Sequence, residues 1–286
     1  MSDKDLKIGI VGHGFVGKAT DWGFDRNTCK FIVDPKNRTN IDQLAEFKPK
    51  LIFVCVPTPM GKNGIQDSSI IEVVTQELTS KCRGSIIVIK STVLPSILEK
   101  IKKTNNKIIY NPEFLREKHA NEDFVNSEMI IFGGDKNIAL QVSKFYLNHS
   151  RCRTKKHIFM DISSASLVKY SINTFLASKI TFFNEIYEIF NKHKSNDSWE
   201  SFIGTISLDK RIGESHMNVP GHDGKKGFGG ACFPKDTAAL LKYAENIGIE
   251  LNLLRAVINK NNKIRSQYTE LDDREKEQNV SFGDKI

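Results

Sequence analysis

The residue best suited to covalent chemistry is Cys232, which stands in the glycine-rich stretch GFGGACFPKDTAAL. We expect a helix to begin at Pro234, because proline fits the first helical turn. A thiol just before that helix feels the positive end of the helix dipole and the charge of Lys235, and both favour the nucleophilic thiolate. The flanking glycines remove side chains, so that a ligand can approach the backbone closely. A buried structural thiol is the alternative, but a glycine-rich loop is an unusual place to bury one, and a nucleophile is favoured.

Two pairs of polar residues are spaced by four positions. Lys169 and Asn173 stand in a segment of helical periodicity, so their side chains share one face. An ammonium group on an otherwise apolar face can stabilise a developing oxyanion, although a surface lysine that extends to solvent is the more common case. Glu113 and Glu117 follow the segment KIIY. Paired carboxylates can act as general acid and base, but an exposed helix face is the more common explanation, and spacing alone does not decide.

A further motif is typical of dinucleotide binding. Gly12, Gly14 and Gly17 match G-x-G-x-x-G in KIGIVGHGFVGKAT, directly after a predicted strand. The glycines allow a tight turn, the approach of a pyrophosphate, and close packing of helix on strand. Asp34 ends the next predicted strand, where a carboxylate accepts hydrogen bonds from the ribose hydroxyls of NAD and repels a 2′-phosphate. NAD is therefore expected rather than NADP, although Lys36 leaves some use of NADP open, and a purely structural glycine turn is the alternative.

The first 160 residues alternate short β-rich runs with polar or helical stretches. This alternation predicts a parallel sheet with helical crossovers, and several runs are apolar on both faces, as strands covered on both sides must be. The expected fold class is α/β, with a Rossmann-like, doubly wound parallel sheet over 1–160. The predicted strands are Lys7–Val11, Lys30–Val33, Leu51–Val56, Ser85–Lys90, Lys107–Tyr110, Met129–Phe132 and His157–Met160.

The remaining residues have helical character. Ser163 and Ser164 can cap a helix, and the segment that follows has apolar residues at helical spacing without Pro or Gly. Two further helices are predicted within 234–268. We expect an all-α central domain over 161–270 that carries the cysteine loop, and then a charged tail over 271–286, either a frayed helix end or a solvated segment.

Length and composition bound the class of protein. The chain has 286 residues, of which 39% are hydrophobic and 27% charged, an ordinary globular composition. By length this corresponds to about two domains. The longest uninterrupted apolar run, Leu51–Val56, is far shorter than the roughly 20 residues that span a bilayer. The opening MSDKDLK has no apolar stretch behind a basic region, so we expect no secretory signal and residence in the cytoplasm.

The patterns of cysteine, histidine and charge argue against metal and nucleic acid. The five cysteines form no CxxC pair, and the seven histidines show no HExxH or HxxxH pairing, so neither a disulfide nor a metal site is expected. The net charge of +8 comes from dispersed basic residues. Their densest cluster, Arg151–His157, is short and has no aromatic platform beside it, so nucleic-acid binding is not expected. A basic protein also attracts phosphorylated small molecules.

Taken together and in order, these motifs resemble those of the UDP-glucose/GDP-mannose dehydrogenase family, whose members are nucleotide-sugar 6-dehydrogenases. The resemblance covers nearly all of residues 6–242. It implies an N-terminal Rossmann domain, a helical middle region that forms a homodimer interface, and a four-electron oxidation of a sugar C6 alcohol to a carboxylate with two NAD. The matching segments are GHGFVG, VPTPMGKNGIQD, KSTVLP, NPEFLRE, SLVKYSINTFLASKITFFNE, LDKRIG and GFGGACFPKD, and the last is highly specific to the family.

The resemblance implies catalytic roles. Cys232 would attack the aldehyde left by a first hydride transfer, and a second hydride transfer from this thiohemiacetal would leave a thioester that water hydrolyses. Lys169 would stabilise the oxyanions. Asn173 and Asp236 would anchor the water that shuttles protons, and Glu113 would be the general base in hydrolysis.

The resemblance also implies binding residues and a partner. Arg211, in LDKRIG, resembles an arginine that reaches the substrate of a neighbouring subunit, so a homodimer would be part of the catalytic unit. Thr92 resembles a threonine beside the catalytic site. The residues expected against the cofactor are Gly12, Gly14, Phe15, Val16, Gly17, Asp34, Val56, Pro57, Thr58, Ser91, Thr92, Glu117 and Lys235. Those expected against the substrate are Glu113, Phe114, Leu115, Lys169, Asn173, Arg211, Phe228, Gly229 and Gly230.

The sequence departs from the family pattern in two respects. Lys118 stands where the family usually has glycine, and family members continue into another Rossmann-like domain that holds much of the nucleotide, whereas this sequence stops at Ile286. We expect a compact NAD-dependent UDP-sugar dehydrogenase that is active alone or with this domain supplied by a second chain, and a catalytically silent NAD-binding or dimerising protein is an alternative. A two-electron β-hydroxyacid-type dehydrogenase, which has no need of Cys232, is another. UDP-glucose is favoured as the substrate over a UDP-amino sugar or a GDP-sugar.

Overall fold

The computed structural model describes residues 6–24, 27–193 and 196–283. Contacts between Cα atoms divide the chain into two compact units. The first unit consists of Met1–Thr58 and Asp67–Lys169, and the second of Pro59–Gln66 and Tyr170–Ile286. The short segment Pro59–Gln66, from the N-terminal half of the sequence, therefore belongs to the second unit.

The first unit is built on one seven-stranded sheet with the strand order β2-β1-β3-β4-β5-β6-β7. All seven predicted strands are present, and neighbouring strands are parallel except for the pair β5 and β6. The strands are β1 (Leu6–Val11), β2 (Thr28–Val33), β3 (Leu51–Val54), β4 (Ile86–Ile89), β5 (Ile108–Tyr110), β6 (Ile130–Gly134) and β7 (His157–Met160).

The prediction of a fully parallel sheet is wrong for that one pair, because β6 runs antiparallel to β5. A parallel neighbour requires a crossover that returns the chain to the edge of the sheet where the previous strand began. The connection over 111–129 holds only the 3₁₀ turn η4 (Glu117–His119) and the short helix α5 (Ala120–Val125). By contrast, α6 (Lys136–His149) is a full crossover, and the strands that it joins, β6 and β7, are parallel.

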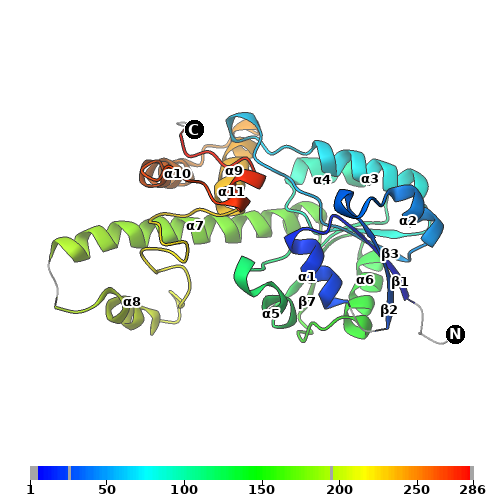
Figure 1. The fold of residues 1–286 in the computed structure, drawn as a ribbon, viewed down its shortest axis with the longest axis horizontal. Coiled ribbons are helices and arrows are strands. Elements are labelled where there is room, and N and C mark those ends of the chain that lie inside the picture. Colours follow the sequence, from blue (N-terminus) through cyan, green and yellow to red (C-terminus); the bar gives the residue numbers. More distant parts are fainter. Residues whose placement is uncertain (1–5, 25–26, 194–195, 284–286) are drawn as a thin grey trace. The chain divides into compact units, whose positions relative to one another are not determined.

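Helices cover both faces of this sheet (Figure 1). Leu44, Ile71 and Leu98, from α2, α3 and α4, pack on one face in a single hydrophobic cluster with strand residues. Phe124 of α5 and Tyr146 of α6 pack on the opposite face. Helices on both faces define a doubly wound fold, so the predicted Rossmann-like α/β class is confirmed. The bounds of the helices not yet given are α1 (Phe15–Gly23), α2 (Ile41–Phe47), α3 (Ser69–Lys81) and α4 (Pro95–Lys102), with the 3₁₀ turn η2 (Pro35–Asn37).

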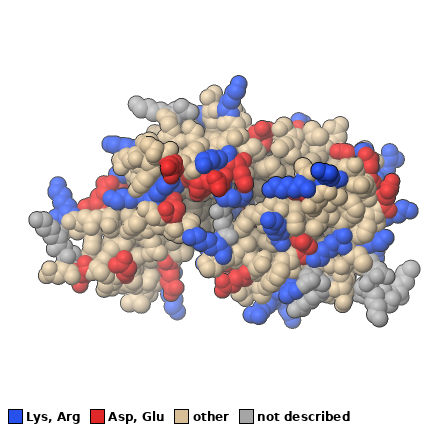
Figure 2. Space-filling view, viewed as in Figure 1, with Lys and Arg blue, Asp and Glu red and all other residues tan. Residues whose placement is uncertain are grey.

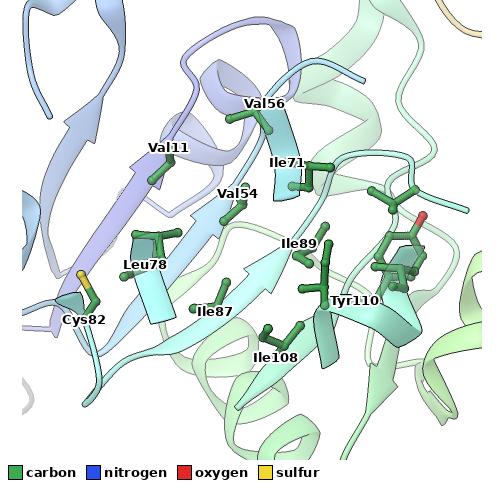
Figure 3. Packing of buried hydrophobic residues seen from close by; sticks show 14 of the residues in the cluster. Val11, Val54, Val56, Ile71, Leu78, Cys82, Ile87, Ile89, Ile108 and Tyr110 are labelled. Atoms are coloured by element: carbon green, nitrogen blue, oxygen red, sulfur yellow. The ribbon is translucent and has the colours of Figure 1, made fainter. Parts of the chain in front are cut away.

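Strand β4 shows why the strands are apolar throughout. Ile87 and Ile89 belong to the cluster drawn in Figure 3, together with Tyr110 of β5, whereas Val88 belongs to the cluster on the other face. Side chains of a strand alternate between the two faces, so a strand covered on both faces needs an apolar residue at every position. Each such fully buried side chain stabilises the fold by about 1.5–3 kcal/mol.

The second unit is helical, and its longest helix, α7 (Ile162–Lys192), begins within the first unit. Ser163 and Ser164 do not cap this helix with their side chains as predicted. Instead, Oδ1 of Asp161 accepts hydrogen bonds from the N–H groups of Ser163 at 2.9 Å and of Ser164 at 3.0 Å. Hydrogen bonds from Ser164, followed by the Ser163 amide, outweigh partial burial and hold the pKa of Asp161 below its ordinary value. The other helical elements are η3 (Lys62–Gly64), α8 (Trp199–Ser207), α9 (Phe233–Asn246), α10 (Asn252–Arg265) and α11 (Asp273–Glu277).

Helices α9 and α10 confirm the two helices predicted within 234–268, whereas α8 has no counterpart among the predicted helices. The hydroxyl of Ser198 caps α8 by accepting a hydrogen bond from an amide of its first turn. Trp199 and Ile203 of α8 pack with Phe183 of α7 in a separate apolar cluster. A helix of nine residues has too few apolar positions for its periodicity to be recognised in the sequence. Its packing against α7 therefore stabilises the helical conformation.

The prediction of a solvated tail over 271–286 is wrong for the part that the structure describes. Helix α11 forms there, and the side chain of Glu275 is fully buried. Val280 and Phe282 are buried as well. The segment is polar in composition, but the charge of Glu275 meets that of Arg265 inside the second unit, and the segment therefore packs as part of that unit.

Charged side chains are dispersed over the face drawn in Figure 2, where Lys and Arg lie among Asp and Glu. None of the helices within the described ranges combines the length with the apolar character that a bilayer span requires. Among the same residues, no three His, Cys, Asp or Glu side chains gather in a way that could hold a metal ion.

Candidate active site

The glycine motif of the first unit forms the turn between β1 and α1. Gly12 has a φ of +86°, and a Cβ there would lie 2.7 Å from the carbonyl oxygen of Cys55. A Cβ on Gly17 would lie 2.0 Å from the carbonyl oxygen of Gly12, so only glycine lets α1 pack this closely. Gly14 immediately precedes α1, and nothing lies within 4 Å of a Cβ added there. The turn, the close packing and the open approach are the three features that a pyrophosphate site at a helix N-terminus needs.

The carboxylate of Asp34 is fixed by the backbone around the same turn. Oδ2 accepts a hydrogen bond from the N–H of His13 at 2.7 Å, and Oδ1 accepts one from the N–H of Lys36 at 2.9 Å. Partial burial raises the pKa of Asp34, but these hydrogen bonds and the charge of Lys36 outweigh it, so the pKa lies below its ordinary value. Each carboxylate oxygen can accept a second hydrogen bond, so the charge is held in place and still able to bind a hydroxyl.

The carboxyl ends of β3 and β4 are tied together by two hydroxyl groups. Ser91 donates to the carbonyl oxygen of Val56 at 2.7 Å, and Thr58 donates to that of Thr92 at 2.9 Å. These four residues are buried, whereas Pro57 between them is exposed. The bonds join two loops at the sheet edge where doubly wound folds bind their ligands.

Lys169 and Glu113 form a buried ion pair in the first unit. Nζ of Lys169 lies 3.3 Å from Oε1 of Glu113 and donates to the carbonyl oxygen of Glu113 at 2.5 Å. The other carboxylate oxygen accepts the N–H of Leu115 at 2.7 Å, and the ring of Phe114 lies 5.1 Å from Nζ. The Lys169 and Glu113 side chains are only 4% and 9% exposed. A solvent-extended side chain is therefore wrong for Lys169, and an exposed helix face is wrong for Glu113, which lies in a loop.

A second buried lysine, for which no role is predicted from the sequence, holds the loop that carries Glu113. Nζ of Lys90 donates to Oδ1 of Asn111 at 2.9 Å and to the hydroxyl of Tyr146 at 3.3 Å. Burial lowers the pKa of Lys90. Because Asn111 precedes Glu113 by two residues, this network fixes the start of the loop. In the sequence, Lys90 appears only as the first residue of KSTVLP, and its spacing from other residues does not indicate a function.

In the second unit, Asn173 of α7 meets the first turn of α9. Its Nδ2 donates to Oδ2 of Asp236 at 2.6 Å, and Nζ of Lys235 lies 2.5 Å from the other oxygen of the same carboxylate. All three side chains are buried. The charge of Asp236 is therefore compensated by its neighbour in the chain, and Lys235, expected against the cofactor, is engaged in this ion pair.

Cys232 is the N-cap residue of α9, so the helix begins one residue earlier than predicted. The carbonyl oxygen of Cys232 accepts the N–H of Asp236 at 2.9 Å, which sets the two residues one helical turn apart. The thiol residue is only partly buried, which argues against a purely structural core cysteine. It stands at the N-terminus of a 14-residue helix, which is the placement that the sequence predicts.

The glycine loop before Cys232 is less open to a ligand than the sequence predicts. A Cβ on Gly229 would lie 1.7 Å from Nη2 of Arg265, so glycine at this position makes room for an arginine of the chain itself. Phe228 is buried in an apolar cluster with residues of α7 and α10. Gly230 has a φ of +75° and open space at its Cβ position. Of Phe228, Gly229 and Gly230, only Gly230 therefore keeps the predicted room for a ligand.

Arg211 lies in the turn that follows α8. Its side chain is 87% exposed, and Nη2 lies 2.6 Å from Oδ2 of Asp209. Lys179 of α7 donates to the carbonyl oxygens of Ile212 at 3.0 Å and Gly213 at 3.1 Å. The turn is therefore fixed at its base by Lys179, while the guanidinium group points to solvent.

The predicted site residues thus divide between the two units. The first unit holds the glycine turn with Phe15 and Val16 at the start of α1, Asp34, the loops after β3 and β4, and the Lys169–Glu113 pair. The second holds Cys232 with its glycine loop, the Asn173–Asp236 pair and Arg211. The side chain of Glu117 lies outside the described residues.

Comparison with known proteins bears directly on this division. Residues 48–148 match the NAD binding domain of the UDP-glucose/GDP-mannose dehydrogenase family, and residues 163–263 match its central domain. The chain belongs to this family. The NAD binding domain of the UDP-glucose/GDP-mannose dehydrogenases is therefore present in this chain, in agreement with the cofactor predicted from the glycine motif.

Curated relatives in the family cover most of this chain. A UDP-glucose 6-dehydrogenase of Rickettsia felis is 34% identical over 237 residues, which are 79% of this chain and 50% of that protein. The UDP-glucose 6-dehydrogenase TuaD of Bacillus subtilis is 33% identical over 225 residues, which are 75% of this chain and 47% of that protein. The chain spans about half the length of these UDP-glucose/GDP-mannose dehydrogenases.

Solved structures show the same fold. A UDP-glucose dehydrogenase from the archaeon Pyrobaculum islandicum has a TM-score of 0.76 at 26% identity and covers 92% of this chain and 69% of its own. A 3-hydroxyisobutyrate dehydrogenase from Mycobacterium tuberculosis has a TM-score of 0.67 at 16% identity, with 97% of this chain and 96% of that one covered. The second likeness shows the fold alone, and it extends this fold beyond the UDP-glucose/GDP-mannose dehydrogenases.

Proposed function

We propose that this chain takes part in the NAD-dependent oxidation of the C6 alcohol of a nucleotide sugar to a carboxylate, with Cys232 as the covalent nucleophile. The observation that carries the proposal is the place of Cys232 at the N-terminus of α9, one helical turn from the buried Asn173–Asp236 pair. The relatives in Rickettsia felis and Bacillus subtilis are UDP-glucose 6-dehydrogenases. UDP-glucose is therefore the favoured substrate.

The residues of the first unit fit a bound NAD. Space is open at Gly14, directly before α1, and the N-terminus of that helix attracts a pyrophosphate. Asp34 would accept hydrogen bonds from ribose hydroxyls and disfavour a 2′-phosphate, and the loops from Val56 to Thr58 and from Ser91 to Thr92 would line the same sheet edge. NAD, when bound there, supplies the acceptor for each of two hydrides.

Cys232 accounts for the second oxidation. Its thiolate adds to the C6 aldehyde, a C–S bond forms, and the carbonyl oxygen takes up a proton to give a thiohemiacetal, which can then lose that proton and a second hydride to leave a thioester. Water then adds to the resulting thioester, the C–S bond breaks, and the carboxylate leaves as the thiol is restored. In this proposal Lys169 stabilises the oxyanions and Glu113 takes a proton from the attacking water. Asn173 and Asp236 hold the water that carries protons.

A homodimer through α7 is the favoured assembly. Phe175, Phe182 and Ile189 are 67%, 55% and 55% exposed and recur at intervals of seven residues. Such spacing sets large apolar side chains along one helix face, the pattern of a helix that packs against another. The exposed Arg211 suits a role toward the substrate of a partner subunit.

The test is the stoichiometry of NADH formed per UDP-glucose consumed by the purified 286-residue chain, with Cys232→Ser compared against Cys29→Ser, an exposed cysteine outside the site. The proposal expects two NADH per sugar in the wild type and in Cys29→Ser, and loss of this turnover in Cys232→Ser. One NADH per substrate, retained in Cys232→Ser, would overturn the thioester and indicate a two-electron dehydrogenase.

Absence of NADH at millimolar UDP-glucose has a separate meaning. If the chain still quenches or shifts NADH fluorescence, it binds the cofactor without catalysing the reaction alone, and the proposal fails for the isolated chain. Turnover restored by an added chain that carries a substrate-binding domain would then indicate half of a split enzyme. Continued silence would indicate an NAD-binding or dimerising protein.

A further inference from the structure

The loop that leads to Cys232 is held by side chains from other segments rather than by regular secondary structure. Asn184 of α7 accepts the N–H of Gly227 at 3.0 Å. Asn261 of α10 accepts the N–H of Phe228 at 2.7 Å and donates to the carbonyl oxygen of Phe228 at 3.0 Å. Backbone groups in such a loop have no ladder or helix to satisfy them, so these side chains set its conformation.

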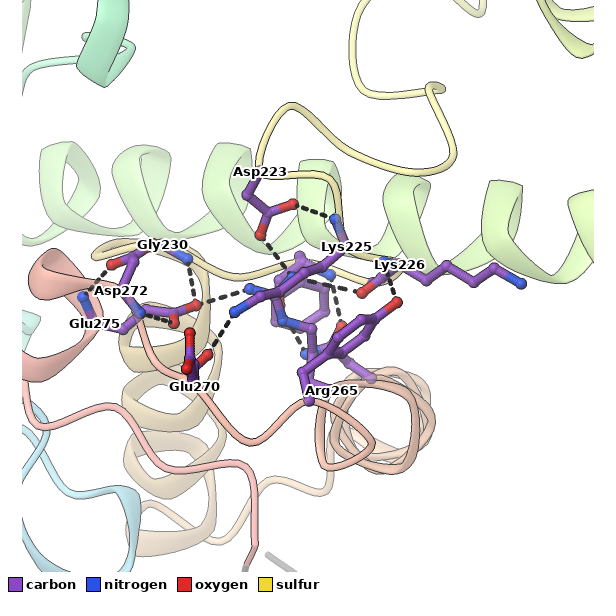
Figure 4. A network of polar contacts seen from close by, with 12 residues as sticks. Asp223, Lys225, Lys226, Gly230, Arg265, Glu270, Asp272 and Glu275 are labelled. Atoms are coloured by element: carbon purple, nitrogen blue, oxygen red, sulfur yellow. Dashed lines mark hydrogen bonds and ion pairs between the residues drawn. The ribbon is translucent and has the colours of Figure 1, made fainter.

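The last tie before Cys232 comes from a buried ion pair. Oε1 of Glu275 accepts the N–H of Gly230 at 3.0 Å and lies 2.8 Å from Nη2 of Arg265 (Figure 4). Nη1 of Arg265 lies 2.7 Å from a second carboxylate, that of Asp223, whose pKa it holds below the ordinary value against the effect of burial. The Arg265 and Glu275 side chains are 1% and 0% exposed.

The sequence of the loop is matched to this pair. A Cβ on Gly229 would lie 1.7 Å from Nη2 of Arg265 and 2.4 Å from Oε1 of Glu275. The absence of a side chain at 229 is thus what allows the carboxylate to reach the amide of Gly230. Gly229 therefore has a structural role, which is to make room for the Arg265–Glu275 pair, whether or not a ligand binds.

Glu275 belongs to a C-terminal strap, defined here as residues 268–283, that also holds a second loop of the same unit. The N–H of Met60 donates to the carbonyl oxygen of Gln278 at 2.9 Å. The guanidinium group of Arg265 lies 5.3 Å from the ring of Phe282. Arg265 and the strap both lie beyond residue 263, where the match to the family's central domain ends.

We propose that Glu275, paired with Arg265, is a positioning residue for Cys232. By fixing the peptide of Gly230, two residues upstream, it sets the backbone with which Cys232 enters α9 and so keeps the thiol at the positive end of that helix. The inference rests on the proposed function of Cys232 as the nucleophile. In this proposal Glu275 acts on the thiol through its hydrogen bond to the Gly230 amide.

The experiment measures the rate of alkylation of Cys232 by iodoacetamide from pH 6 to pH 10, read at that residue by peptide mass spectrometry. Loss of the tie in Glu275→Ala moves the thiol away from the helix end, so the pH midpoint rises and the rate at neutral pH falls at least about threefold, as a shift of roughly half a pKa unit requires. Loss of a nearby negative charge alone would lower the midpoint. The direction of the shift therefore separates position from charge.

Glu277→Ala is the matched control, because Glu277 stands on the same helix with its side chain 55% exposed, and its profile should equal the wild type. Glu275→Ala leaves Arg265 short of a partner in the interior and can unfold the unit. The double variant Arg265→Met, Glu275→Leu removes the tie together with both members of the fully buried pair, so that only the partly exposed carboxylate of Asp223 loses its partner, and it should show the same rise. An unchanged or lowered midpoint in this folded double variant overturns the inference.

The outcome stays distinct from that of the proposed function because alkylation requires no turnover. A raised midpoint without any NADH formation would retain the positioning role and reject catalysis by the isolated chain. Two NADH per sugar together with an unshifted midpoint would reject only the positioning role.

Discussion

Asn173 of α7 and Asp236 of α9 are joined by a hydrogen bond of 2.6 Å between Nδ2 and Oδ2, although they are 63 residues apart in the chain. Both side chains are buried. The bond ties the longest helix of the protein to the first turn of the helix that begins after Cys232. The same contact that stabilises the helical unit therefore orients a carboxylate one turn from the proposed nucleophile.

Replacement of Asn173 by Ala should lower the free energy of unfolding by about 1–3 kcal/mol, because it leaves a buried carboxylate oxygen without its hydrogen-bond donor. The measurement is urea unfolding followed by circular dichroism. Ser171→Ala, at an exposed position of the same helix, should change stability by less than about 0.5 kcal/mol. Equal stability of the two variants would show that the amide contributes nothing to the fold.

The glycine turn separates a packing role from a ligand role. Gly17→Ala places a Cβ 2.0 Å from a carbonyl oxygen, so it should destabilise the first unit by about 1–3 kcal/mol or more. Gly14→Ala meets open space at a φ of −75°, so its stability should match the wild type while NADH affinity, measured by fluorescence titration, falls about tenfold, or ~1.4 kcal/mol. Full NADH affinity in Gly14→Ala would contradict a pyrophosphate at this turn.

The cap of α7 should make a pH-dependent contribution to stability. Asp161→Ala should cost about 0.5–2 kcal/mol at pH 7. The folded pKa of Asp161 lies below its usual value of 3.8, so this contribution is complete above pH 3.8 and is lost as the pH falls through the folded pKa. Unfolding of both proteins from pH 7 to pH 2 should show the difference shrink at the acid end. Asp161→Asn caps the helix without a charge, so at pH 7 its free energy of unfolding should differ little from that of the wild type.

Thiol labelling should follow burial in the first unit. Burial raises the pKa of the Cys55 thiol to about 12, so at pH 8 native Cys55 should resist iodoacetamide for as long as the unit stays folded. Cys29 is exposed and should react first. Mass spectrometry of tryptic peptides after timed labelling measures both residues in one sample. Rapid labelling of Cys55 without urea would show that the centre of the sheet opens to solvent.

The exposed stripe on α7 should be the part of the surface that associates. Phe175→Glu together with Phe182→Glu places charges on this face and should shift the sedimentation coefficient from a dimer to a monomer with an unchanged circular dichroism spectrum. Leu208→Glu, at an 80% exposed residue that ends α8 rather than on α7, serves as the control. A monomeric wild type, or a double variant that sediments with the wild type, would remove α7 as the interface.

Much of the fold follows from local features of the sequence. The alternation of apolar runs with helical stretches predicts the seven strands, because a strand covered on both faces must be apolar at every position. The glycine motif is equally local, since a turn with positive φ at Gly12 and close packing at Gly17 leave no other residue type possible. These requirements act within a few residues of the chain.

What the sequence pattern does not give are the partners of charged residues. Glu113 and Lys169 look like surface residues by spacing, and Glu275 lies in what reads as a solvated tail, yet all three are held in buried pairs. A charge can leave water only when an opposite charge and hydrogen bonds meet it there. Those partners come from distant segments, so composition alone assigns such residues to the surface.

The sequence by itself therefore determined the α/β class, the dinucleotide turn and the place of Cys232 before a helix, because each depends on the conformational preferences of neighbouring residues. Only the tertiary structure decided the antiparallel strand β6, the cap at Asp161, and the ties from Asn173, Arg265 and Glu275 that surround the cysteine loop. The physical reason is that these features are contacts between segments far apart in the chain, and their energy exists only once the fold has brought the segments together.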